Sequence, residues 1–278
     1  MTTEIQGQCR KMPAELTDDQ QVIYQLQLGD QSVVINDYLE QKITLSFAGE
    51  INCIHCDRKT KKSFAQGYCF PCMKSLAQCD QCIMSPERCH YAAGTCREPE
   101  WGEQFCMTDH IVYLANTTAA KVGLTRVNQI PTRWIDQGAE QALPIMRVAT
   151  RQQAGFIEDA LREHIADKTN WRNMLKGSAE RIDLQVLRQE LMALSKDAIE
   201  EVKQRFGAEN FIELDQQSTV TLNFPVIEYP KKITSFNLDK NPTAEGVLQG
   251  IKGQYLIMDT GVINLRKYTG YQLSLAIG

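Results

Sequence analysis

The chain has 278 residues, of which 43% are hydrophobic and 23% are charged. This is the composition of a globular protein with room for two domains, and it excludes a disordered or fibrous chain. The formal net charge of −4 excludes a general attraction to polyanions, so any contact with nucleic acid has to be a local basic patch.

The N-terminal residues show neither a signal peptide nor a membrane anchor. "MTTEIQGQCRKMPAEL" lacks the apolar stretch of a secretory signal, and no apolar run in the chain approaches the roughly 20 residues of a membrane span. We therefore expect a cytoplasmic protein without a membrane partner. "VIYQLQLG", "QSVVIND" and "ITLSFAGE" predict strands in an N-terminal β segment, residues 1–50, which is able to join a C-terminal β domain.

Residues 51–106 are predicted to form cysteine-rich metal-binding modules. Ten cysteines are present in the chain, and nine of them lie in this segment. In a reducing compartment such dense pairs indicate metal binding rather than disulfides. "CIHCDRKTKKSFAQGYCFPC" contains two Cys-x2-Cys pairs, the spacing of a zinc ribbon. The predicted ligands of this first, structural Zn²⁺ site are Cys53, Cys56, Cys69 and Cys72.

A second metal site is predicted in "CDQCIMSPERCHYAAGTCREPEWGEQFC". Cys79 and Cys82 form its obvious pair of ligands. The spacing leaves the other two ligands open, and the candidates are Cys89, His90, Cys96 and Cys106. Zinc is the first choice, and an iron–sulfur cluster is the alternative because it also takes four thiolates. Closed sites of this type are structural rather than catalytic.

Residues 107–177 are predicted to form a core with the order β-β-α-β-α. "HIVYLA" and "AKVGLT" indicate two short strands joined by a polar turn. A helix is expected from Pro131, followed by a third strand in "LPIMRVAT". "RQQAGFIEDALREHIA" places Ile157, Leu161 and Ile165 at helical spacing.

This order resembles the GIY-YIG nuclease superfamily over about 70 residues, from His110 to Leu175. Ile111-Val112-Tyr113 stands at the first motif, and Lys121-Val122-Gly123 stands at the second. The family's helix arginine, metal-binding glutamate and downstream asparagine correspond to Arg133, Glu158 and Asn173, with Asn170 as a competitor for the last. The first motif lacks its glycine, Lys121 replaces the tyrosine of the second, and Gln137 stands one turn after Arg133 instead of a histidine. The chain also resembles an uncharacterised bacterial domain-of-unknown-function family that combines such cysteines with such a core.

The nuclease resemblance implies a metal-dependent phosphodiesterase acting on DNA or RNA. Glu158 would bind one Mg²⁺ or Mn²⁺, and Arg133 would neutralise the phosphoryl oxygens. Tyr113 would activate or orient the attacking water, with Lys121 as an electrostatic partner and Asn173 completing the site. Read from the residues alone, Tyr113 is equally a core aromatic, Glu158 a surface residue and Arg133 a partner of Asp136. The alternatives are a non-catalytic zinc-containing nucleic-acid-binding protein and a zinc-stabilised scaffold for a protein partner.

Trp134 and Trp171 lie beside Arg133 and Arg172, which raises base stacking as a hypothesis, although tryptophans in amphipathic segments more often pack a core. A long connecting helix is predicted over residues 178–207, with Ser178 as its N-cap. Residues 208–278 alternate like a β-rich barrel or sandwich. The predicted fold class is therefore α+β, with zinc-ribbon-like modules, a GIY-YIG-like core and a C-terminal β domain.

Overall fold

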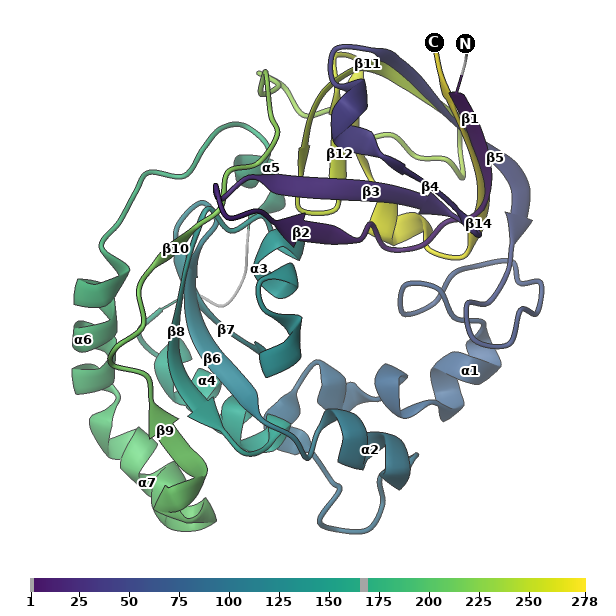
Figure 1. Ribbon diagram of the computed structural model, residues 1–278. Helices are drawn as coiled ribbons and strands as arrows, with labels where there is room; N and C mark the ends of the chain where they lie inside the picture. Colours follow the sequence, from purple (N-terminus) through teal and green to yellow (C-terminus); the bar gives the residue numbers. More distant parts are fainter. Residues whose placement is uncertain (1–2, 166–169) are drawn as a thin grey trace.

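The computed structural model describes residues 3–165 and 170–278 (Figure 1). Its strands form three sheets, and the helices lie mainly in the middle of the chain, so the predicted α+β class is confirmed. No helix among these residues combines the length and the apolar character that crossing a membrane requires.

The central sheet has the strand order β10-β8-β6-β7, and β9 also pairs with β8. Its strands are β6 (His110–Asn116), β7 (Ala120–Arg126), β8 (Gln141–Val148), β9 (Phe211–Glu213) and β10 (Val220–Thr221). Helix α3 (Thr132–Asp136) precedes β8, and α4 (Arg151–Arg162) follows it. The predicted order of strands and helices in this segment is therefore found. Thr150 fixes the start of α4 through a capping box with Gln153.

The two faces of β6 enter different hydrophobic cores, as the alternation of side chains along a strand requires. Tyr113 and its neighbours on one face pack with α3 and with the sheets built from the chain ends. Val112 and Leu114 on the other face pack against α4 and the helices that follow. Because both faces are covered, every residue of β6 is buried.

The long helix expected over residues 178–207 is divided into two helices. Asp183, not Ser178, caps α6 (Leu184–Leu194), and α7 (Lys196–Phe206) follows. Ser195 separates the two helices, and it is buried beside α4 with its hydroxyl 3.4 Å from the carbonyl oxygen of Ala160. A short helix, α5 (Trp171–Met174), precedes them.

Strands from both ends of the chain build one antiparallel sheet of order β1-β14-β5-β11-β12-β13. Its strands are β1 (Thr3–Gln8), β5 (Lys42–Ile51), β11 (Thr243–Lys252), β12 (Tyr255–Met258), β13 (Gly261–Asn264) and β14 (Tyr271–Ile277). The order ends at β1 and β13, so the described strands form an open sheet, and of the two predicted forms, barrel or sandwich, the closed barrel is not found. A second sheet contains β2 (Ala14–Leu16), β3 (Val22–Leu28) and β4 (Gln31–Val34), and it shares a hydrophobic core with the first.

The cysteine-rich segment contains only short helices. These are α1 (Phe70–Ser75), η2 (Ala77–Cys79), η3 (Gln81–Ile83), η4 (Pro86–Arg88) and α2 (Pro99–Phe105). Single turns of 3-10 helix elsewhere are η1 (Ile35–Tyr38), η5 (Val127–Gln129), η6 (Ala208–Asn210) and η7 (Leu265–Tyr268). The turn η4 lies on α4 so closely that a Cβ at Gly155 would come within 2.7 Å of the backbone nitrogen of Glu87. The cysteine-rich segment therefore packs directly on the central sheet's main helix.

Candidate functional site

Four cysteines meet between the end of β5 and the start of α1. Cys53 follows β5, and a turn closed by the Asp57 amide and the Cys53 carbonyl (2.9 Å) carries Cys56. Cys69 is the N-cap of α1, and Cys72 lies one turn into that helix. Three of the four are buried and Cys56 is exposed. We call Cys53, Cys56, Cys69 and Cys72 the first cysteine group.

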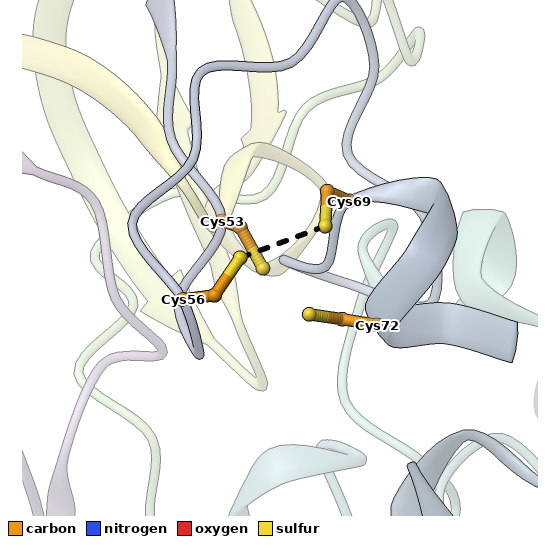
Figure 2. A group of neighbouring side chains, drawn as sticks. All are labelled: Cys53, Cys56, Cys69 and Cys72. Carbon is orange, nitrogen blue, oxygen red and sulfur yellow. Dashed lines mark hydrogen bonds between the residues drawn. The ribbon is translucent and has the colours of Figure 1, made fainter. Parts of the chain in front are cut away.

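The geometry of the first cysteine group fits one tetrahedral metal ion. All four sulfur atoms lie within 4.8 Å of one another and point toward a common centre (Figure 2). The Cys56 and Cys69 sulfurs are 3.7 Å apart, far longer than the bond of about 2.05 Å in a disulfide. A tetrahedron with Zn–S bonds of about 2.3 Å has edges of about 3.8 Å. This group could therefore hold a metal ion such as zinc.

The electrostatics of the first cysteine group favour deprotonation of Cys53 and oppose deprotonation of Cys72. Burial alone raises the pKa of Cys53, but hydrogen bonds from the backbone amides of Cys56, Cys69 and His55 outweigh it and lower that pKa to about 6. Burial, the neighbouring thiols and the Cys53 charge raise the pKa of Cys72 well above its usual value. A divalent cation removes this conflict, because it stabilises all four negative sulfurs together.

The remaining cysteines of the segment do not gather as the sequence predicts. Cys79 packs against the first cysteine group and Leu76, whereas Cys82 lines a separate small cavity. The expected Cys79–Cys82 pair is thus divided between two places. The cavity is lined by Cys82, Cys89, Cys96 and Cys106, which we call the second cysteine group. Asp80, Cys82 and His90 also place one potential ligand atom each within 4.8 Å of one another.

Tyr113 is the centre of a polar cluster on the face of the central sheet that carries α3. Its side chain is fully buried, and its hydroxyl accepts a hydrogen bond from Gln137 Nε2 at 2.9 Å. Arg133, one turn earlier on α3, is exposed and also hydrogen-bonds the Tyr113 hydroxyl. Gly123 lies directly opposite Tyr113 on β7, and the space above it holds the tyrosine ring.

Glu158 reaches the same cluster from α4. Burial is the main cause that raises the pKa of Tyr113, and the charge of Glu158 raises it further against the opposing effects of Arg133 and Gln137. Interaction with Tyr113 raises the pKa of Arg133, and Glu158 adds to that shift. Glu158 is half-buried. We call Tyr113, Arg133, Gln137 and Glu158 the Tyr113 cluster.

Asp136 does not take Arg133 as its main partner. It forms an ion pair with Lys11 at 2.5 Å, and its other oxygen accepts a hydrogen bond from Gln254 at 3.0 Å. These contacts tie α3 to the sheets of the chain ends. Tyr113 is the main partner of Arg133, although the charge of Asp136 also raises the pKa of Arg133.

Lys121 and Asn173 stand in different relations to the Tyr113 cluster. Lys121 lies opposite Ala115 and is buried, and it shares the face of Tyr113 because it is two residues from Gly123. Asn173 lines a groove of about 540 Å³ with Asn170 and Lys176 beside the β6–β7 turn. Among the described residues that line this groove, none belongs to the Tyr113 cluster.

The two tryptophans have their ring faces occupied within the protein. Trp134 is buried, 2% exposed, and meets Tyr113 edge to face with the ring centroids 6.0 Å apart. Trp171 stacks on Tyr255 with the centroids 5.6 Å apart, and the guanidinium of Arg172 lies 4.3 Å from the centre of its ring. These contacts favour the interpretation of both tryptophans as packing residues.

Two residues near the sites are not singled out by any motif. Gln137 stands where the resemblance expects a histidine, and it donates a hydrogen bond to the Tyr113 hydroxyl. The sequence signal for this role was its position one helical turn after Arg133, which puts both side chains on the same face. Arg151, at the start of α4, donates to the carbonyl oxygen of Ile83 at 2.8 Å. Its charge also interacts with Cys106 and with Glu158. Arg151 therefore lies between the second cysteine group and the Tyr113 cluster, which the spacing in the sequence cannot reveal.

Comparisons with known proteins give a single family. A family model described as "Protein of unknown function (DUF2797)" matches residues 40–273, from the start of the six-stranded sheet's β5 region into β14. In the comparisons with curated proteins and with solved structures, nothing matches the chain.

Proposed function

The chain belongs to the DUF2797 family, whose description assigns no activity, and we propose from its own residues that it is a metal-dependent phosphodiesterase acting on DNA or RNA. The observation that carries the proposal is that Arg133 hydrogen-bonds the Tyr113 hydroxyl and that the charge of Glu158, on a third element, acts on both residues. A cation, a carboxylate and a hydroxyl in one place are the groups that phosphodiester cleavage needs.

Arg133 is the residue proposed to bind the scissile phosphate. Its side chain is exposed, and its pKa is raised, so it stays charged and open to a ligand. Tyr113 positions it: the buried hydroxyl has a raised pKa and remains protonated, which makes it a hydrogen-bonding anchor rather than a base. A fixed guanidinium stabilises the charge that develops on phosphoryl oxygens.

Glu158 is the residue proposed to hold the catalytic cation. A half-buried carboxylate suits Mg²⁺ or Mn²⁺, which bind through one or two carboxylates together with water and substrate phosphate. When bound, the ion supplies charge for the leaving oxygen. Lys121 adds a second cation on the face of Tyr113, and Asn173 is kept as a candidate contact to the nucleic acid from its neighbouring groove.

The first cysteine group is proposed to bind a structural Zn²⁺. Four thiolates close the coordination sphere and leave no position for a substrate. The ion would fix the junction between β5 and α1, which has few buried apolar side chains of its own. The spacing of these sulfurs fits a single tetrahedral ion, and zinc is the ion proposed because closed four-cysteine sites of this kind are typical structural zinc sites.

Binding of nucleic acid without cleavage is the second candidate. The complete burial of Tyr113 favours it, because a buried and protonated phenol cannot touch a substrate in this conformation. The exposed Arg133 would then bind phosphate without chemistry.

Cleavage of labelled single-stranded, duplex and branched DNA and RNA with Mg²⁺ or Mn²⁺ tests the proposal. Glu158→Gln is expected to abolish cleavage, and Arg133→Ala to slow it by at least about 100-fold. Glu163→Gln is the matched control, because Glu163 is an exposed glutamate that caps the end of the same helix.

The outcomes separate the candidates. Metal-dependent cleavage lost in Glu158→Gln and kept in Glu163→Gln supports the phosphodiesterase. Salt-sensitive binding without cleavage, unchanged in Glu158→Gln, supports the binding protein. Absence of both contradicts each of them and leaves a zinc-stabilised scaffold for a protein partner.

A further inference from the structure

The second cysteine group surrounds a cavity of the size of one ion. The cavity has a volume of about 10 Å³, close to the minimum of about 10–15 Å³ that a single water molecule needs. Four sulfur-bearing residues face it, as well as the rings of Tyr91 and Trp101. A cavity this small and this rich in sulfur has no room for an organic ligand.

Four separate pieces of chain supply the cysteines that line this cavity. Cys82 lies in η3, Cys89 follows η4, and Cys96 precedes α2. Cys106 caps the C-terminal end of α2, and its carbonyl accepts the Arg151 amide at 2.8 Å. All four cysteines line the same small cavity.

The segment that carries this group packs on α4 through η4 but has few buried apolar side chains of its own. Its helices are one or two turns long, and its residues enter the described hydrophobic cores only at Tyr68, Leu76, Cys79 and the first cysteine group. Chain segments without a core of their own are usually stabilised by disulfides or metals. All ten cysteines are free, which leaves a metal.

Cys79 is excluded from this group although it immediately precedes Asp80 and lies three residues before Cys82. It packs with Cys53, and that cysteine's charge contributes to the raised pKa of Cys79. The first cysteine group already supplies four sulfurs. Cys79 is therefore a neighbour of the first site and a ligand of neither.

The set Asp80, Cys82 and His90 is a weaker alternative. The Asp80 carboxylate is already bound by Arg97 Nε at 2.6 Å and by the Gln81 amide at 2.5 Å. The His90 ring is held by Thr95, with Nδ1 2.9 Å from the threonine hydroxyl oxygen. Recruiting Asp80 would compete with its ion pair to Arg97, whereas none of the second cysteine group's thiols is used in an ion pair among the described residues.

Two arginines lie where a metal site of four thiolates needs them. Such a site carries a net charge of −2, and its burial requires nearby cations. The Arg151 amide donates to the Cys106 carbonyl at 2.8 Å, and the Arg126 guanidinium lies 4.7 Å from the ring centre of Phe105, the residue before Cys106. The Nε of Arg151 is buried and has no hydrogen-bond partner among the described residues, so it is available to a thiolate.

We propose that Cys82, Cys89, Cys96 and Cys106 bind a second structural Zn²⁺, separate from the first and without Cys79 or His90. The ion would join the cysteine-rich segment to the start of α4, the helix that also carries Glu158. This assignment does not rest on the proposed nuclease activity.

The first measurement is the zinc content per chain of the full-length protein. The protein is loaded with zinc, and excess metal is removed before the measurement. We expect two ions in the wild type and one in Cys82→Ser, Cys89→Ser, Cys96→Ser and Cys106→Ser. Cys79→Ser and His90→Gln, the matched controls, are expected to keep two. A single ion in the wild type, or loss of the second in His90→Gln, would overturn the proposal.

X-ray absorption of the zinc-loaded wild type keeps the proposal testable if the variants do not fold. We expect only sulfur neighbours at about 2.3 Å, because both sites would be all-cysteine. Nitrogen or oxygen neighbours at about 2.0–2.1 Å would overturn it in favour of a site containing His90 or Asp80. Iron with acid-labile sulfide in the purified protein would overturn the choice of zinc. None of these readouts involves cleavage, so they fail independently of the phosphodiesterase.

Discussion

Tyr113 on β6 lies directly across from Gly123 on β7, and its hydroxyl is over that glycine. A Cβ at Gly123 would come 2.7 Å from the Tyr113 hydroxyl oxygen. The absence of a side chain at one residue therefore fixes the position of a polar group on the other strand. Through that hydroxyl the glycine also determines where Arg133 lies.

Gly123→Ala is expected to displace the Tyr113 hydroxyl and to cost about 1–3 kcal/mol in stability through overpacking. Cleavage should fall further than stability alone explains, because Arg133 loses its anchor. Urea unfolding and the cleavage assay measure the two effects. Gly177→Ala is the control, since a Cβ there meets nothing within 4 Å. Unchanged cleavage in Gly123→Ala would contradict the positioning role.

Tyr113→Phe is expected to keep the packing and lose the hydrogen bonds from Gln137 and Arg133. Each bond contributes about 1 kcal/mol, and a misplaced Arg133 should slow cleavage by about 100-fold. Tyr271→Phe also removes a hydroxyl bond, to Asp239 at 2.8 Å, without touching the cluster. Tyr271→Phe should lose stability and retain cleavage. Equal cleavage by Tyr113→Phe and Tyr271→Phe would argue against the proposed site.

Removal of metal from the first cysteine group is expected to unfold the β5–α1 junction. A zinc concentration about 1,000 times the dissociation constant stabilises the folded state by about 4 kcal/mol, and a chelator removes this contribution. Cys72→Ser should lose one zinc per chain. The backbone amides near the β5–α1 junction should then exchange their hydrogens faster than in the wild type. Cys9→Ala is the control, because Cys9 is a buried thiol outside both groups. Loss of zinc in Cys9→Ala would be inconsistent with the ligand assignment.

Glu140→Gln is expected to cost about 3–5 kcal/mol, because it leaves a buried cation without its charged partner. Lys252 is completely buried, and its ammonium binds Glu140 and the carbonyl oxygen of Gly177, the latter at 3.3 Å. The exposed Lys42–Glu245 pair, 3.5 Å apart, is the comparison, and Glu245→Gln should cost less than about 1 kcal/mol. Denaturant unfolding of both variants tests this, and equal losses would contradict the distinction.

Stability should fall in acid partly because of His110. Burial lowers the pKa of His110 to about 4, whereas an unfolded histidine has a pKa of about 6.5. The unfolded chain takes up the proton first, so this contribution is complete above about pH 6.5 and is lost as the pH falls to 4. The loss is at most about 3 kcal/mol. His110→Gln should flatten the dependence relative to wild type, and exposed His164→Gln should not; the same slope in all three proteins would exclude this origin.

Local patterns in the sequence were sufficient for the central elements. The pattern of hydrophobic residues predicts the bounds of β6, β7, β8 and α4 to within a few residues. Each of these elements buries a whole face, so its apolar residues recur at regular spacing in the sequence. The first cysteine group follows from two Cys-x2-Cys pairs, because each pair supplies ligands within a single turn. The family with no assigned function, to which the resemblance pointed, is confirmed.

Other features depend on contacts that no local pattern contains. The apolar stripe in the sequence continues past Ser195, but the helix is divided there. The division depends on the packing of Ser195 against α4, which no local pattern contains. "STVTLNFPVIEY" alternates like a strand, but only Val220–Thr221 pairs regularly, and the two prolines that follow donate no backbone hydrogen bond. Cys79 and Cys82 have the spacing of a ligand pair, yet they belong to different 3-10 turns: Cys79 packs against the first cysteine group, and Cys82 lines the small cavity.

The six-stranded sheet has a consequence for how the chain is made. β5 lies between β11 and β14, so both of its neighbours are translated roughly 200 residues after it. At about 5–20 residues per second on the ribosome, Ile43 and Leu45 wait at least about 10 s for their partners. The central sheet is closed earlier, because β6, β7 and β8 follow one another directly. Synthesis and assembly therefore run in different orders, and the nascent N-terminal strands are the part of this protein that depends most on protection from aggregation before release.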